Sequence, residues 1–301
     1  MQLTFLGTAG SWPTRDRSAS AIALDLEEEI VLLDCGEGTQ RQFFRSPVSF
    51  MRVRRVLLTH FHGDHVLGLP GLIQTMGLNQ RTEPLDVYGP RDTRRFVEMM
   101  THLGYSEPRF PVLAHELEGG ETLDAGTYTI SCAAATHTIP ALAFRVEERE
   151  KRGRFDGARA RALGVRGPEF RALEEGRTVT TRTGETVRPE TVMGPPRSGR
   201  SVVYTGDTRP TPAIVQLAQG ADVLVHEATF ADGLQAMAEE WGHSTAAEAA
   251  AVAKEAQVGE LFLTHFSARY PETAPLEEEA RTVFPSTRAA EDLLTHLLRQ
   301  R

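Results

Sequence analysis

Short apolar runs separated by turn residues predict a series of strands along the chain. The predicted strands occupy residues 3–6, 21–26, 30–33, 56–59, 85–88, 128–135, 141–146, 201–205, 222–225 and 261–264. Glu27, Glu28 and Glu29 separate the second and third runs and indicate a hairpin between them.

Apolar residues at helical spacing predict helices between several of these strands. The predicted helices occupy residues 66–78, 91–103, 244–256 and 286–298, and Ser244 is a candidate N-cap of the third. Because strands and helices occur in both halves of the chain, we predict an α/β fold, an αββα sandwich in which helices cover two facing sheets.

The segment 148–200 differs from the rest of the chain. It is rich in Arg, Gly and Pro, and it lacks a long apolar period. We predict that it is an arm inserted into a single domain spanning residues 1–301, with short helices near 156–163 and 168–175. Residues 149–188 carry eleven basic and six acidic side chains, whereas the net charge of the whole chain is −8. This local charge is either a solvated surface or a contact for a polyanion.

Composition limits the class of protein. The chain has 301 residues, 40% of them hydrophobic and 25% charged, which is typical of a globular protein able to bury a full core. The sequence contains no 18-residue apolar run and begins without a signal-peptide pattern, so we expect a cytoplasmic protein without a membrane span. The two cysteines, Cys35 and Cys132, allow one disulfide at most and fit a reducing compartment.

The sequence Thr59-His60-Phe61-His62-Gly63-Asp64-His65 carries the clearest chemistry. It places four candidate metal ligands directly after a predicted strand. His60 and His62 point the same way on an extended chain, and Gly63 permits a sharp turn before Asp64 and His65. One loop can therefore serve two metal ions. The alternative, a polar surface loop rich in histidine, is weaker because three of the ten histidines fall within six residues.

Further candidate ligands follow other predicted strands. They are His137, Asp207 and His265. A single histidine after a strand is more often a capping or structural residue, but together these three supply what the loop lacks. Zinc prefers imidazole and carboxylate ligands, and manganese or iron can occupy the same kind of site. Asp34, at the end of the third predicted strand, is a candidate hydrogen-bond partner of a ligand histidine.

These residues carry a family resemblance. His-x-His-x-Asp-His followed by His, Asp and His at later strand ends resembles the metallo-β-lactamase pattern, and several further motifs resemble tRNase Z (ribonuclease Z), the tRNA 3′-processing endonuclease. The motifs are Phe5-Leu6-Gly7-Thr8, Leu33-Asp34-Cys35-Gly36-Glu37-Gly38-Thr39-Gln40, His226-Glu227-Ala228-Thr229-Phe230, His243-Ser244-Thr245 and Thr264-His265-Phe266-Ser267-Ala268-Arg269-Tyr270. The resemblance extends from residue 3 to about residue 270.

The resemblance implies two zinc ions per subunit and a role for each site residue. One zinc would be bound by His60, His62 and His137, the other by Asp64, His65 and His265, and Asp207 would bridge them. Asp64 would also accept a proton from the attacking water. His243, oriented by Glu227, would donate a proton to the departing 3′ oxygen.

The resemblance also implies a role for the inserted segment. Segment 148–200 would be the arm that grips tRNA, with Gly167-Pro168 matching the Gly-Pro motif of that arm, and the subunits would form a homodimer. Arg269 and Ser267, which follow His265, are candidates either for a phosphate contact or for a packing role. The chain departs from the family pattern at Thr14-Arg15-Asp16-Arg17, where many members carry an Asn-containing motif.

We therefore predict a zinc-dependent endoribonuclease that removes the 3′ trailer from precursor tRNA. The products would be a 3′-hydroxyl on the tRNA and a 5′-phosphate on the trailer. Two alternatives are a phosphodiesterase of the same fold that acts on small phosphate esters such as cyclic nucleotides, and a non-catalytic RNA-binding protein that contains zinc.

Overall fold

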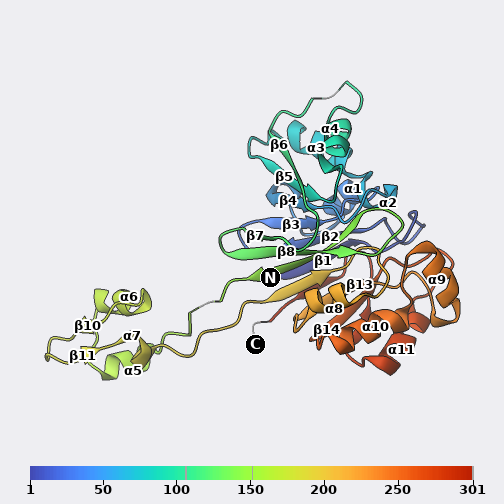
Figure 1. Cartoon of the computed structure of the whole chain (residues 1–301). Helices are drawn as coiled ribbons and strands as arrows, with labels where there is room; N and C mark the ends of the chain where they lie inside the picture. Colours follow the sequence, from blue (N-terminus) through green and yellow to red (C-terminus); the bar gives the residue numbers. More distant parts are fainter. Residues whose placement is uncertain (106, 151, 300–301) are drawn as a thin grey trace. The chain divides into compact units, whose positions relative to one another are not determined.

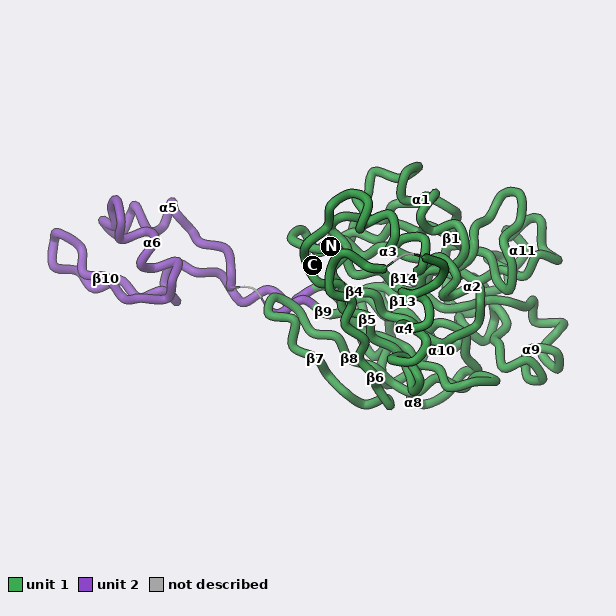
Figure 2. Tube along the Cα trace, turned by 90° about the horizontal axis from the view of Figure 1, so that it is seen from above, with its two compact units in different colours: residues 1–147, 200–299 green, residues 148–199, 300–301 purple. Residues whose placement is uncertain are grey.

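The computed structural model describes residues 1–105, 107–150 and 152–299, and it divides them into two compact units. The first unit comprises Met1–Glu147 and Arg200–Arg299, and the second comprises the described residues of Glu148–Gly199 (Figure 2). Lys151, within the predicted arm, lies outside the described residues.

Two seven-stranded sheets form the centre of the first unit. The first sheet has the order β16-β1-β2-β3-β4-β5-β6 and the second has the order β15-β14-β13-β12-β9-β8-β7. The strands of the first sheet are β1 (Gln2–Gly7), β2 (Ala21–Asp25), β3 (Ile30–Leu33), β4 (Val53–Leu57), β5 (Leu85–Gly89), β6 (Val112–Glu116) and β16 (Thr295–Leu297). Those of the second are β7 (Thr122–Asp124), β8 (Tyr128–Ala135), β9 (Ala141–Glu148), β12 (Ser201–Tyr204), β13 (Val223–Glu227), β14 (Glu260–Thr264) and β15 (Thr287–Ala289).

The two sheets pack face to face through a buried apolar layer. Phe5 of β1 and Phe262 of β14 contribute to this layer with ring centroids 5.2 Å apart, and Phe144 and Tyr204 are also buried in it. Burial of this apolar surface is the main force that holds the sheets together. It also brings the ends of strands from both sheets close to one another.

Helices cover the outer face of each sheet. On the first sheet these include α3 (Leu69–Leu78) and α4 (Thr93–Thr101), and on the second they include α8 (Pro212–Ala218), α10 (Ala246–Glu255) and α11 (Ala274–Val283) (Figure 1). The remaining helices of this unit are α1 (Thr39–Arg45), η1 (Phe50–Arg52), α2 (Gly63–Val66), η2 (Asp232–Leu234) and α9 (Gln235–Trp241). The predicted αββα sandwich is thereby confirmed. No helix in the described ranges is long and apolar enough to cross a membrane.

The predicted helix at 286–298 is wrong. The structure has β15 and β16 in its place, because Leu293 adopts a left-handed backbone conformation (φ 67°) that a helix cannot contain. Thr287–Ala289 instead extend the second sheet beside β14, and Thr295–Leu297 pair with β1.

Two other helix predictions need adjustment. The predicted helix at 66–78 corresponds to α3, which begins at Leu69, because Val66 is the last residue of the separate helix α2. The N-cap of α10 is Thr245 rather than Ser244, and the Thr245 hydroxyl and the Glu248 side chain form a reciprocal capping box. Ser244 is buried and donates its hydroxyl to the carbonyl of Thr208.

The second unit has its own small core. It contains α5 (Gly157–Ala162), α6 (Pro168–Glu174), β10 (Val179–Thr180), β11 (Thr186–Val187) and α7 (Pro189–Val192). Ala160, Val165, Leu173, Val187 and Val192 are buried within it. The side chain of Asp156 caps α5 by accepting a hydrogen bond from the Arg159 amide.

Candidate metal centre

Strand direction brings the candidate ligands to one edge of the sandwich. β12, β13 and β14 are parallel, and β9 is antiparallel to β12. The connection from β8, which ends at Ala135, to its neighbour β9, which begins at Ala141, is too short for a parallel crossover, so β8 runs in the same direction as β12. His137, Asp207 and His265 follow the carboxyl ends of β8, β12 and β14. The loop after β4 supplies His60 and His62, and helix α2, which follows this loop, supplies Asp64 and His65.

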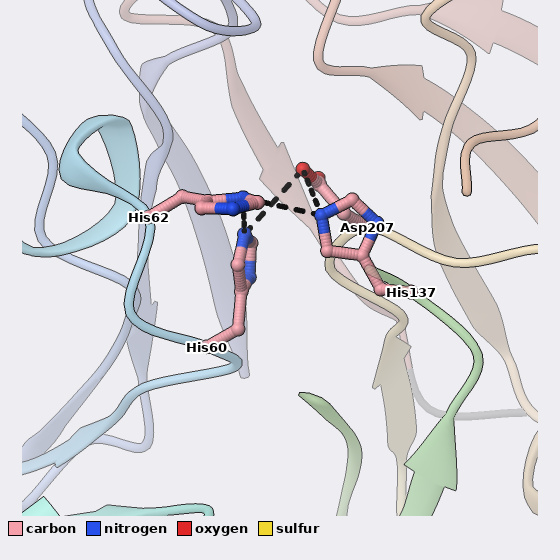
Figure 3. Close-up of side chains that lie close together, drawn as sticks. All are labelled: His60, His62, His137 and Asp207. Carbon is pink, nitrogen blue, oxygen red and sulfur yellow. Dashed lines mark hydrogen bonds and ion pairs between the residues drawn. The ribbon is translucent and has the colours of Figure 1, made fainter. Parts of the chain in front are cut away.

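One cluster combines three histidines with a carboxylate. The ligand atoms of His60, His62, His137 and Asp207 all lie within 4.8 Å of one another. His62 Nδ1 lies 3.1 Å from the Nε2 atoms of both His60 and His137. Asp207 Oδ2 lies 3.6 Å from His60 Nε2, and Figure 3 shows the three rings turned toward one another and toward this carboxylate.

A second cluster adjoins the first. Asp64, His65 and His265 converge, with His265 Nε2 3.2 Å from both His65 Nε2 and Asp64 Oδ2. Asp207 also faces this cluster, because its Oδ1 lies 3.3 Å from His265 Nε2. Its carboxylate therefore stands between the two groups of ligands.

The chemistry of these residues fits a metal cofactor. Burial lowers the pKa values of His60, His62 and His137 below the usual range, which favours the neutral ring that binds a metal. Burial raises the pKa values of Asp64 and Asp207, but neighbouring histidines lower them by more, so both carboxylates stay ionised. Asp207 Oδ1 is buried and accepts no hydrogen bond from the described residues, although His265 Nε2 lies 3.3 Å away. A buried anionic oxygen without a donor is costly, and a cation at this point would satisfy it.

Buried hydrogen bonds fix the orientation of the ligands. Asp34 Oδ2 accepts hydrogen bonds from His65 Nδ1 (2.7 Å) and from the hydroxyl of Tyr204 (2.8 Å), which confirms the predicted contact of Asp34 with a ligand histidine. His137 Nδ1 donates to the carbonyl of Gly242 at 2.8 Å. These contacts engage Nδ1 of His65 and of His137 and so leave the Nε2 atoms of these two rings facing the metal centre.

His243 and Glu227 form a pair beside the two clusters. His243 Nδ1 lies 2.9 Å from Glu227 Oε1, and 3.8 Å from Asp207 Oδ2. Burial lowers the pKa of His243, but the Glu227 carboxylate raises it by more, to about 9. Glu227 is itself held by the amides of Thr208 and Thr229.

The spacing of the candidate ligands in the sequence does not predict two contacts of the metal centre. The Thr229 hydroxyl donates to Glu227 Oε2 (2.6 Å) and accepts from His265 Nδ1 (2.8 Å). It therefore joins the His243–Glu227 pair to the candidate ligand His265. The amide of Ser11 donates to Asp64 Oδ2 at 2.7 Å. Thr229 could have been suspected from its place two residues after Glu227, but a backbone amide leaves no trace in the sequence.

The predicted substrate-binding residues lie in different places. Arg269 stacks over the ring of Phe230 at 4.8 Å and donates from Nε to Ser267 Oγ, a few residues after His265. Gly167 and Pro168 begin α6 in the second unit, where Gly167 has a φ of +54°. The structure thus assembles the seven predicted ligands with His243 and Glu227, while Gly167 and Pro168 belong to a separate compact unit.

Known proteins resemble this chain over nearly its whole length. Residues 1–100 match the model of the anti-Pycsar protein Apyc1 family, and residues 174–266 match that of the beta-lactamase superfamily domain. A ribonuclease Z from Methanosarcina acetivorans is 44% identical over 296 residues, which cover 98% of this chain and 97% of that protein.

Solved structures give the same result. The crystal structure of human tRNase Z, short form, superimposes with a TM-score of 0.73 at 28% identity, covering 99% of this chain and 100% of that one. A metallo-beta-lactamase fold protein from Bacillus subtilis has a TM-score of 0.70 at 22% identity, covering 98% of each chain, and shares the fold. With the ligand clusters in place and this identity over almost the full length, the chain belongs to the ribonuclease Z family.

Proposed function

We propose that this protein is an endoribonuclease that removes the 3′ trailer from precursor tRNA. The observation that carries the proposal is the convergence of seven imidazole and carboxylate ligands beside the His243–Glu227 pair, in a chain of the ribonuclease Z family. Hydrolysis leaves a 3′-hydroxyl on the tRNA and a 5′-phosphate on the trailer.

The cofactor we propose is a pair of zinc ions per subunit. His60, His62 and His137 would hold one ion, and Asp64, His65 and His265 would hold the other. The position of the Asp207 carboxylate between the two groups supports a bridging role. Bound divalent ions supply positive charge that stabilises the attacking and leaving oxygens of an in-line phosphoryl displacement.

Asp64 acts on the attacking side of the phosphate. The Ser11 amide and His265 both hold its Oδ2, so this carboxylate has a fixed orientation. We assign to Asp64 the orientation of the attacking water and the acceptance of its proton.

His243 acts on the leaving side. Because its Nδ1 faces Glu227, Nε2 is the nitrogen available to donate a proton to the departing 3′ oxygen. Glu227 stabilises the protonated ring, and its own oxygens are held by three donors from Thr208 and Thr229. This pair supplies the proton that converts the leaving oxygen into the 3′-hydroxyl of the product.

We further propose that Glu148–Gly199 is an inserted tRNA-binding arm. Its excess of basic side chains supports contact with the RNA backbone, and the Gly167–Pro168 turn at the start of α6 supports its likeness to the arm of the family. Arg269 is the corresponding candidate for a phosphate contact beside the metal centre. We also propose a homodimer, which the resemblance to ribonuclease Z implies, and a cytoplasmic location, which the two cysteines of the chain fit.

A direct test is to incubate the metal-loaded protein with a 3′-extended tRNA precursor and map the cut. Cleavage after the discriminator nucleotide is expected, and Asp64→Asn should abolish it. Glu98→Gln, on the exposed face of α4, is a matched control that should retain full activity. An intact precursor, together with hydrolysis of a cyclic nucleotide by the same preparation, would refute the tRNA assignment.

A further inference from the structure

The two tryptophans of this chain, Trp12 and Trp241, are both exposed, and each adjoins in the chain a residue that contacts the metal centre. Their exposed fractions are 61% and 59%. Neither indole forms a ring contact with another residue in the described part of the chain. Each is carried by a segment whose backbone lies against a metal-binding side chain.

Trp12 is fixed beside Asp64 and His265. A Cβ on Gly10 would lie 2.8 Å from two ring atoms of His265, so only glycine lets the chain pass this closely. The next residue, Ser11, donates its amide to Asp64 Oδ2 at 2.7 Å, and the Trp12 amide donates to the Gly10 carbonyl at 2.8 Å. Trp12 therefore directly follows Ser11, whose amide contacts Asp64, the residue assigned to orient the attacking water.

Trp241 is fixed beside His137 and His243. It is the last residue of α9, and Gly242 ends this helix in a left-handed conformation with a φ of 69°. The Gly242 carbonyl accepts a hydrogen bond from His137 Nδ1, and a Cβ on Gly242 would lie 3.1 Å from the same atom. Trp241 is therefore held two residues before His243, the group assigned to the leaving oxygen.

Two other aromatic side chains near the centre are covered. Phe230 is 4% exposed beneath the guanidinium of Arg269, and Phe266 is 1% exposed beneath that of Arg17. The two tryptophans thus differ from these two phenylalanines in offering an exposed aromatic surface. Unpaired nucleobases stack on such surfaces, and proteins commonly recognise single-stranded RNA ends in this way.

We propose that Trp241 and Trp12 stack on the two bases that flank the scissile phosphate. This inference rests on the proposed tRNA-processing function. The departing 3′ oxygen belongs to the last nucleotide retained by the tRNA, and its proton donor is His243, so Trp241 receives the base of that nucleotide. Trp12, on the side of Asp64, receives the base of the first trailer nucleotide.

The test is a double-mutant cycle between the protein and the RNA. Three precursors are compared: an unmodified one, one abasic at the last retained nucleotide, and one abasic at the first trailer nucleotide. Trp241→Ala is expected to lower kcat/KM for the unmodified precursor about 5- to 150-fold, the range typical of losing one base stack. On the precursor abasic at the last retained nucleotide, the same substitution should change kcat/KM less than about twofold. Trp12→Ala should show this pattern with the other abasic precursor.

Two further variants serve as controls. Trp→Phe at either position should recover most of the activity, because phenylalanine retains a face for stacking. Tyr105→Ala removes an exposed aromatic ring that no part of the proposal involves, and it should leave all three rates unchanged. Circular dichroism and thermal unfolding of each variant verify that the fold is intact.

The outcomes separate this inference from the proposed function. A wild-type protein that does not cleave the unmodified precursor contradicts the tRNA-processing function itself. Normal cleavage by wild type, with tryptophan variants that act equally on all three precursors, overturns the stacking. A change of oligomeric state in Trp12→Ala or Trp241→Ala without a change in these ratios would overturn it too, and would make the indoles subunit contacts.

Discussion

Replacing Thr229 by valine should weaken metal binding and slow cleavage together. The Thr229 hydroxyl lies 2.6 Å from Glu227 Oε2 and 2.8 Å from His265 Nδ1, so Thr229→Val removes one donor to a buried carboxylate and one acceptor for a ligand histidine. Valine has nearly the same shape, so the loss concerns the hydroxyl rather than the packing.

The magnitude follows from these two contacts. A hydrogen bond to a charged group contributes about 1.5–3 kcal/mol, and losing a contact that orients a metal ligand typically costs about 10- to 100-fold in metal affinity or activity. We expect a loss of this size in zinc affinity, measured by competition with a fluorescent chelator, and a comparable fall in kcat on precursor tRNA. Because His243 loses the fixed orientation of Glu227, kcat should fall more than KM rises.

Two further variants make the experiment decisive. Thr229→Ser keeps the hydroxyl and should restore both zinc affinity and kcat to within about threefold of wild type. Thr122→Val makes the same substitution on the exposed strand β7 and should change neither. If Thr229→Val binds zinc and cleaves tRNA as well as wild type does, the hydroxyl plays no part in positioning these groups.

Three other predictions follow from the described contacts. Replacing Glu148–Gly199 by a short linker is feasible because Gly199 packs on the carbonyl of Glu148. This replacement should abolish tRNA cleavage while leaving hydrolysis of bis(p-nitrophenyl) phosphate intact. Loss of both activities would argue against a separate RNA-binding role. Removing metal with a chelator should lower the midpoint of thermal unfolding reversibly, as measured by calorimetry, and an unchanged midpoint would show that the ligands are not coupled to folding. Burial raises the pKa of Glu248, but the hydrogen bonds from Arg209 lower it by more, so the pKa in the folded protein lies below the usual 4.5. The stability that the ionised Glu248 contributes is therefore present above pH 4.5 and is lost as the pH falls through the lower folded-state pKa. In urea unfolding the difference between wild type and Glu248→Gln should thus shrink under acid conditions, and a difference that grew as the pH fell would contradict the sign.

Local spacing accounts for the part of the site that the sequence predicts. His60, His62, Asp64 and His65 lie within six residues after an apolar strand, so their convergence depends on one turn at Gly63. His137, Asp207 and His265 are far apart in the sequence, and their residue types alone are weak signals. They meet because parallel strands place their carboxyl ends at one edge of a sheet. Their positions after predicted strands indicate this in the sequence, whereas the order and direction of the strands depend on pairing between distant segments.

The errors occur where the local sequence fits two structures equally well. The apolar positions between residues 286 and 298 fit a helical period, but they also fit two short strands with a turn at Leu293, and pairing with β1 and β14 decides between these. Ser244 and Thr245 are both good caps by residue type. Only the side-chain contacts show that Thr245 pairs with Glu248, while Ser244 turns toward the carbonyl of Thr208.

The metal centre joins the two halves of the sandwich. His60, His62 and His65 follow a strand of the first sheet, whereas His137, Asp207 and His265 follow strands of the second, and the hydroxyl of Tyr204 reaches Asp34 across the same boundary. Ligands that converge from both sheets bring ionised carboxylates together in a buried space, which is unfavourable unless a cation balances them. Metal binding therefore adds a polar connection to the apolar contact of Phe5 with Phe262. For this reason, loss of metal should weaken the attachment of one sheet to the other as well as the chemistry.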